Sequence, residues 1–129
     1  MGMAGEMKAS PFTGRWIADI ERSTRHPANQ FQRAVMEFSV ADDTVTIRHG
    51  YVDEAGERQH GESRIEVDGK ERTADNGYSL KASWRSPRVL ETVATKDGQV
   101  VGHGTYEISE DGSTMTITGP EQTLVLGKQ

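Results

Sequence analysis

The stretch Lys96-Asp97-Gly98-Gln99-Val100-Val101-Gly102, residues 96–102, places a two-residue Asp-Gly turn between segments that read as strands. Hairpin turns of this kind need positive φ angles, which glycine adopts freely and Asp or Asn tolerates. The same kind of turn signal recurs along the chain at Asp53–Gly56, Asp68-Gly69, Asp75–Gly77 and Asp111-Gly112. The recurrence predicts antiparallel strands laid down in sequence order.

The composition indicates a single domain. The 129 residues are enough to bury one hydrophobic core without covalent cross-links. The absence of cysteine excludes a disulfide framework, a thiolate metal site and a cysteine nucleophile. The net charge of −5 argues against nucleic acid and against an anionic membrane as partners. We expect residues 1–10 to form a flexible leader and residues 11–129 to form the domain.

The start of the chain, Met1–Lys8, lacks the basic and apolar regions of a secretory signal. No window approaches the ~18 apolar residues of a transmembrane helix. We therefore expect a cytoplasmic protein with no membrane partner.

Alternating apolar and polar residues predict about nine or ten short strands and no convincing amphipathic helix. The strands are expected at residues 14–20, 34–40, 44–51, 57–67, 70–74, 78–84, 88–95, 99–108, 114–118 and 122–127. Residues 23–30 read as an irregular crossing with room for a short helical turn. Because every connection is short, the pattern favours an all-β, antiparallel up-and-down β-barrel over a Greek-key sandwich.

A family resemblance rests on a set of motifs in fixed order. Gly14-Arg15-Trp16 is similar to the Gly-x-Trp signature of lipocalins and their calycin relatives. The chain from about residue 12 to residue 129 resembles a group of small, mostly uncharacterised bacterial lipocalin-like proteins. The motifs that carry this resemblance are Gly14–Trp16, Glu21–Ser23, Val52–Gly56, Val67–Lys70, Lys96–Gly102 and Ser109–Thr116. The resemblance implies a lipocalin-like antiparallel calyx closed around an apolar interior, and it implies no particular activity.

The chain departs from lipocalins proper at its end. Lipocalins place an arginine near the last strand over the signature tryptophan, whereas this chain offers only Lys128 for that position.

Strand parity predicts which side chains face the interior of the barrel. Aromatic rings with a few polar tips suit an apolar ligand held by one or two hydrogen bonds. The alternative interpretation is that these side chains simply fill the barrel. The predicted ligand-binding set is Met36, Phe38, Ile47, His49, Tyr51, Tyr78, Trp84 and Tyr106.

His49 lies in the middle of a strand on an otherwise apolar face, two residues from Tyr51. It is read as a hydrogen-bonding anchor, a general base or an axial haem ligand, or as a histidine with a purely structural place in the interior. The spacing puts no second titratable group beside it, so the sequence predicts no catalytic residue.

The outward faces carry the charges. His60, Glu62, Arg64 and Glu66 alternate along one strand and read as a solvated outer wall rather than a metal site. His103, between Gly102 and Gly104, reads as a bend in an outward-facing strand. The local positive bias of Arg15, Arg22, Arg25 and Arg33 is interpreted as a scattered, solvated set, with framing of a carboxylate at the barrel mouth as the alternative.

The function predicted from the sequence is binding or transport of a small hydrophobic molecule in the barrel interior. Two alternatives stay open: a barrel isomerase or cyclase acting on a small apolar substrate, and an interaction module that forms a homodimer through an edge strand. The sequence identifies neither a ligand nor a cofactor.

Overall fold

The computed structural model describes residues 10–24, 31–53, 55–73, 77–119 and 122–129. Ten strands form one antiparallel sheet in the order β4-β3-β2-β1-β10-β9-β8-β7-β6-β5. Their bounds are β1 Gly14–Ala18, β2 Phe31–Ala41, β3 Thr44–Asp53, β4 Arg58–Glu66, β5 Glu71–Thr73, β6 Tyr78–Ser86, β7 Val89–Lys96, β8 Gln99–Ile108, β9 Thr114–Gly119 and β10 Gln122–Lys128.

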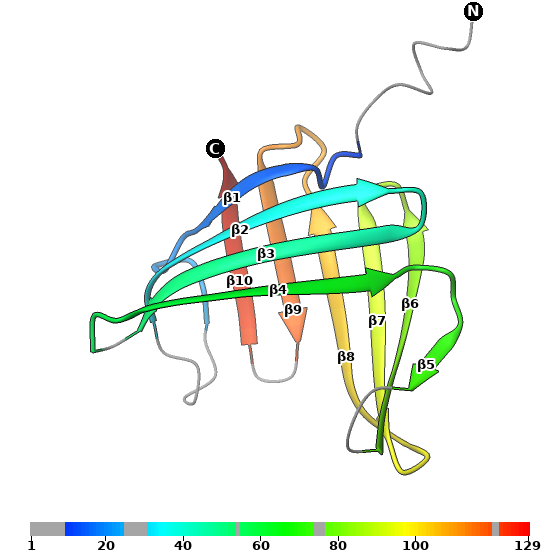
Figure 1. The fold of residues 1–129 in the computed structure, drawn as a ribbon. Helices are drawn as coiled ribbons and strands as arrows, with labels where there is room; N and C mark the ends of the chain where they lie inside the picture. The colour runs from blue at the N-terminus through cyan, green and yellow to red at the C-terminus, as the bar shows by residue number, and fades with distance from the viewer. Residues whose placement is uncertain (1–9, 25–30, 54, 74–76, 120–121) are drawn as a thin grey trace, which may run out of the picture.

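The sheet curls over on itself to make a β-barrel. Strands β1 to β4 run across strands β6 to β10, and the two groups face one another (Figure 1). The first and last strands are neighbours, with Trp16 opposite Lys128, so the up-and-down order expected from the sequence is confirmed. The expected leader and the expected helical turn fall almost wholly on residues 1–9 and 25–30, outside the described part of the chain.

The turns have the backbone angles that their residues favour. In the β7–β8 hairpin, Asp97 has a φ of 51° and Gly98 a φ of 82°, as a tight turn with two positive φ angles requires. The β2–β3 hairpin turns at Asp42, with a φ of 54°, and contains no glycine. No glycine signal marks this turn, which the sequence indicated only through the predicted strands at residues 34–40 and 44–51.

One expected hairpin is absent. Asp68-Gly69 does turn the chain, but its flanking strands β4 and β5 are the two ends of the sheet and form no ladder across their described residues. The amide of Gly69 donates instead to the carbonyl of Ala82 on β6, at 2.8 Å. A turn signal shows where a chain reverses, not which strands pair, so the barrel is open between β4 and β5.

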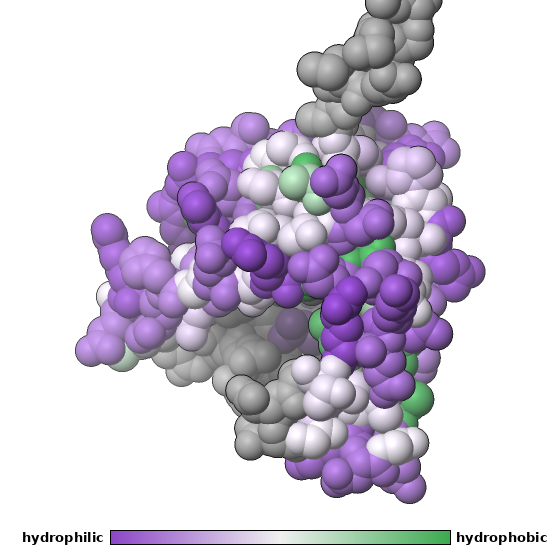
Figure 2. Space-filling model, turned by 45° about the vertical axis from the view of Figure 1, so that its right-hand side comes forward, coloured by the Kyte–Doolittle hydropathy of each residue, from purple (hydrophilic) through white to green (hydrophobic). Residues whose placement is uncertain are grey.

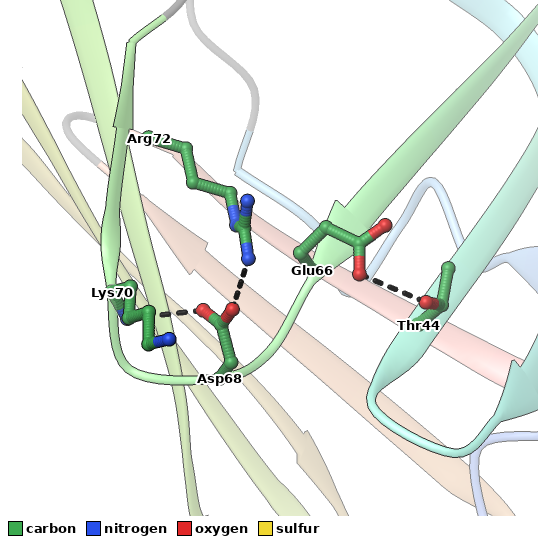
Figure 3. A network of polar contacts seen from close by, with 5 residues as sticks. All are labelled: Thr44, Glu66, Asp68, Lys70 and Arg72. Carbon is green, nitrogen blue, oxygen red and sulfur yellow. Dashed lines mark hydrogen bonds and ion pairs between the residues drawn. The ribbon is translucent and has the colours of Figure 1, made fainter.

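Polar side chains cluster beside this gap (Figure 3). Asp68 forms an ion pair with Arg72. It also accepts a 3.0 Å hydrogen bond from the amide of Lys70. Thr44 on β3 donates to Glu66 at the end of β4, at 3.0 Å. The Arg72 guanidinium and the Lys70 amide hold the pKa of Asp68 below its ordinary value. These contacts fix the turn that links the two sheet edges.

Candidate functional site

The barrel interior is packed at one end and open at the other. On β3, Val45 and Ile47 are 0% and 3% exposed, whereas Tyr51 further along the same face is 38% exposed. On β6, exposure rises in the same manner from Ala82 at 1% to Tyr78 at 40%. Figure 2 shows the molecular surface hollowed near the centre of one face, with mostly hydrophilic residues and a little hydrophobic surface at its margin. Side chains on inner strand faces therefore become accessible toward one end of the barrel.

An aromatic cluster closes the packed end. Phe12 lies 5.5 Å from Trp84 and 6.2 Å from Phe38, measured between ring centroids. Phe38 also contacts Tyr106 edge-on, with 6.2 Å between centroids. Such tilted ring pairs add to the stabilisation from burial alone. Phe38, Ile47 and Trp84 of the predicted set thus belong to, or pack against, the floor of the interior.

The signature tryptophan is fixed in that floor. Trp16 is fully buried, and its indole Nε1 donates to the carbonyl of Phe12 at 3.0 Å. Lys128 Nζ lies 5.5 Å from the Trp16 ring centroid, which is a cation–π distance. Lys128 therefore lies over the Trp16 ring, where lipocalins place an arginine and where this sequence offered only Lys128.

His49 lies on the inner face of β3 above a glycine of β4. A Cβ added to Gly61 would lie 2.7 Å from His49 Nε2, so only glycine leaves room for the imidazole in this position. On the outer face the arrangement is reversed, because His60 of β4 lies over Gly50 of β3. Aromatic rings that cover a cross-strand glycine in this way help to set strand register. Sequence reasoning placed His49 on the inner face but missed the role of Gly61.

Among the described residues, His49 has no acid or base partner. Within the described part of the chain, no carboxylate and no other imidazole is hydrogen-bonded to it. The same residues contain no group of His, Asp and Glu side chains that could hold a metal ion.

Three tyrosines lie at different depths of the interior. Tyr106 is largely buried beside Phe38, and burial raises the pKa of its hydroxyl, which therefore stays a neutral hydrogen-bond donor at physiological pH. Tyr51 and Tyr78 lie nearer the open end, where both are partly exposed. Lys96 Nζ is 4.8 Å from the Tyr78 ring centroid, and it places a cation at the rim.

The inner wall formed by β7 and β8 carries small side chains. Thr92 and Ala94 of β7 are paired with Gly104 and Gly102 of β8 on the inner face. A Cβ at Gly104 would lie 2.7 Å from Thr92 Oγ1, which itself lies 3.4 Å from the Gly104 carbonyl oxygen. His103 points outward between these glycines and is exposed, as its parity predicts. The small residues keep this part of the interior wide.

A second concave surface lies outside the barrel, over β1 to β4. It is an open groove of about 920 Å³. Most of its lining residues lie on the outer face, among them Arg15, Arg33, Arg48, Glu37 and Glu62, and the inner-face residues His49, Tyr51 and Gly61 also reach it. Arg48 is paired with Glu62 at 3.0 Å and with Glu37 at 3.9 Å. The groove is shallow, charged and solvated, so the partly apolar interior is the better candidate for a ligand. Arg25 of the predicted positive set lies outside the described residues.

Together the strand order, the gap and the interior define an antiparallel β-barrel with one open end, built from ten strands in the described residues. Among solved structures, the fluorescent protein UnaG superimposes with a TM-score of 0.69 at 13% identity, covering 92% of this chain and 97% of UnaG. A Schistosoma mansoni fatty acid binding protein in complex with arachidonic acid gives 0.64 at 14% identity, covering 94% and 98%. A REP1-NXSQ fatty acid transporter mutant gives 0.68 at 12% identity, covering 94% and 100%.

These likenesses establish the fold, which confirms the all-β barrel expected from the sequence. No protein-family model and no curated protein sequence matches the chain. In the described residues, no helix is long and apolar enough to cross a membrane.

Proposed function

We propose that this chain binds a small hydrophobic molecule in the open half of the barrel interior. The observation that carries the proposal is the gradient of exposure along the inner faces, from a sealed aromatic floor to partly exposed Tyr51 and Tyr78. A preformed apolar surface that water reaches gains free energy when a ligand covers it, by about 25 cal/mol per Å² before the costs of binding. The fatty acid binding proteins and transporters of the same fold support this class of ligand.

The inner residues suggest how such a ligand would be oriented. Met36, half-buried next to the floor, and the floor residues Phe38, Ile47 and Trp84 would contact its apolar body. His49 and the Tyr106 hydroxyl would supply hydrogen bonds at mid-depth, and Tyr51 and Tyr78 would line the mouth. Lys96, at the rim over Tyr78, offers a place for an anionic end group.

The finer expectations from the sequence stay predictions. They are membership of the bacterial lipocalin-like group, the cytoplasmic location, the homodimer and the absence of nucleic-acid and membrane partners. An isomerase or cyclase activity also stays a prediction, and no contact of His49 favours it over simple binding.

A tryptophan placed inside the barrel tests the site. Ala94→Trp would fill the inner wall opposite Gly102, whereas Val93→Trp places the same side chain on the outer face of the same strand. We expect Ala94→Trp to weaken the binding of anilinonaphthalene sulfonate by about tenfold or more. The affinity for oleate, measured by displacement of this probe, should fall by a similar factor. Val93→Trp should bind both as the unmodified chain does.

The measurement is probe fluorescence, with circular dichroism to show that both variants are folded. Failure of the unmodified chain to bind the probe or oleate would contradict the proposal, and so would equal binding by the two folded variants.

A further inference from the structure

The strand β4, Arg58–Glu66, is an open edge of the sheet. Its nine residues pair with β3 in one uninterrupted register, and its other side has no ladder within the described residues. Natural proteins blunt free edges with short strands, bulges, proline or lysine. The opposite edge, β5, is protected by its length of three residues. β4 has no bulge, no proline and no lysine, and among the described residues no strand pairs with the outer edge of its residues 60–66.

From His60 onward, the outward side chains of β4 alternate between basic and acidic residues. His60, Glu62, Arg64 and Glu66 follow one another along this face, and all four are exposed. Between them, Gly61, Ser63 and Ile65 belong to the inner face and carry no charge. When two identical strands with such a row run in opposite directions, the basic residues of one can lie opposite the acidic residues of the other.

We propose that two copies of this chain associate by antiparallel pairing of β4 with β4, with Ser63 opposite Ser63. In this register Glu62 of each copy faces Arg64 of the other, and His60 of each copy faces Glu66 of the other. Opposite charges directly across a strand pair are stabilising, and like charges are destabilising. Both acidic residues keep their contacts within the chain, since carboxylates accept more than one hydrogen bond.

The alternation also selects this register over its neighbours. Pairing centred on Glu62 would place the two Glu62 side chains together and His60 against Arg64. Pairing centred on Arg64 would place the two Arg64 side chains together and Glu62 against Glu66. A register centred on Gly61 would place Arg58 against Arg64, and one centred on Ile65 would pair only residues 64–66 of β4. Registers centred between two residues pair inner with outer residues, which an antiparallel ladder does not allow. Charge complementarity therefore points to a second copy rather than to an unrelated strand.

The association is expected to be weak and reversible. A single ladder over residues 60–66 buries less than the roughly 1,200 Å² at which stable complexes begin. Sedimentation velocity should show a monomer at low concentration and a growing dimer as the concentration approaches about 1 mM. A protein that stays monomeric throughout this range would overturn the proposal.

Cross-linking tests the register, because the chain has no cysteine of its own. Ser63→Cys places two thiols directly opposite each other on the proposed two-fold axis, within disulfide reach. His60→Cys, on the same strand, places its thiols far apart. Under mild oxidation the Ser63→Cys protein should form a covalent dimer much faster than the His60→Cys protein. Equal rates would overturn the proposed register.

Charge reversal tests the pairing itself. The single variants are Glu62→Arg and Arg64→Glu. Each creates two pairs of like charges in the dimer, one on either side of the two-fold axis, and should weaken dimerisation by about tenfold or more. A mixture of the two variants should dimerise again, because the arginine at position 62 of one copy then faces the glutamate at position 64 of the other. Recovery in the mixture shows that both variants are folded. Unchanged dimerisation of the single variants, or no recovery on mixing, would overturn the proposal.

Discussion

At the residue scale, the site depends on pairs rather than on single side chains. His49 has its place on the inner face because Gly61 stands opposite it, and Thr92 has its place because Gly104 does. Alternation along β3 was enough to predict that His49 faces inward. It could not predict the glycine beneath the ring, because that relation depends on the register between β3 and β4.

A double-mutant cycle tests the pair. Gly61→Ala should displace the His49 imidazole, and we expect it to weaken binding of an apolar ligand about as much as His49→Ala does. The loss of one hydrogen bond corresponds to about 0.5–1.5 kcal/mol. The double variant should bind no worse than either single variant, since both remove the same interaction.

The measurement is the oleate dissociation constant from probe displacement. Gly50→Ala is the matched control, because a Cβ there would lie 3.4 Å from His60 Nδ1 on the outer face. Additive losses in the double variant would show that Gly61 does not act through His49.

At the element scale, the turns explain how much of the fold the sequence could predict. Nearly every strand was predicted within a few residues, because Asp-Gly signals mark where strands end. One feature escaped: the turn at Asp68-Gly69 joins strands that do not pair. The turn at Asp42, which carries no glycine, was placed only by the two predicted strands on either side of it. Pairing depends on the closure of the whole sheet, which no local signal encodes.

The β7–β8 turn gives a stability prediction. Gly98 has a φ of 82° and open space around its missing Cβ, so Gly98→Ala should destabilise the protein only through its backbone angle. The expected cost is about 1–2 kcal/mol. Gly127→Ala, also in open space but at ordinary φ, should change the free energy of unfolding by less than about 0.5 kcal/mol. Urea denaturation measures both, and equal effects would contradict the account.

The β8–β9 turn gives a pH prediction. Hydrogen bonds from Ser109 and from the amide and hydroxyl of Ser113 lower the pKa of Asp111 from 3.8 to about 2. Because the folded-state pKa is the lower one, the stabilisation is complete above the unfolded pKa and is lost as the pH falls toward 2.

We therefore expect Asp111→Asn to flatten the fall in urea midpoint between pH 4 and pH 2. Glu110→Gln, at the neighbouring position, has no such hydrogen bonds among the described residues and is the control. An acid limb that is as steep in Asp111→Asn as in the unmodified chain would show that these bonds do not favour the ionised carboxylate.

At the scale of the whole molecule, the barrel divides into a packed half that stabilises the fold and an open half that offers a site. Phe12, Trp16 and Phe38 close the first half, and the small side chains of β7 and β8 widen the second. The sequence predicted which faces turn inward but not where packing ends, because burial depends on how far the strands splay apart. Binding in the open half is the central claim of the proposed function.

An amide-correlation NMR titration with oleate tests that claim most directly. We predict shifts concentrated at Gly104 and Tyr106, which do not line the outer groove, with the outward-facing His103 and the outer-groove residue Arg48 changing little. Shifts confined to the outer groove around Arg48, or no shifts at saturating oleate, would contradict binding in the barrel interior.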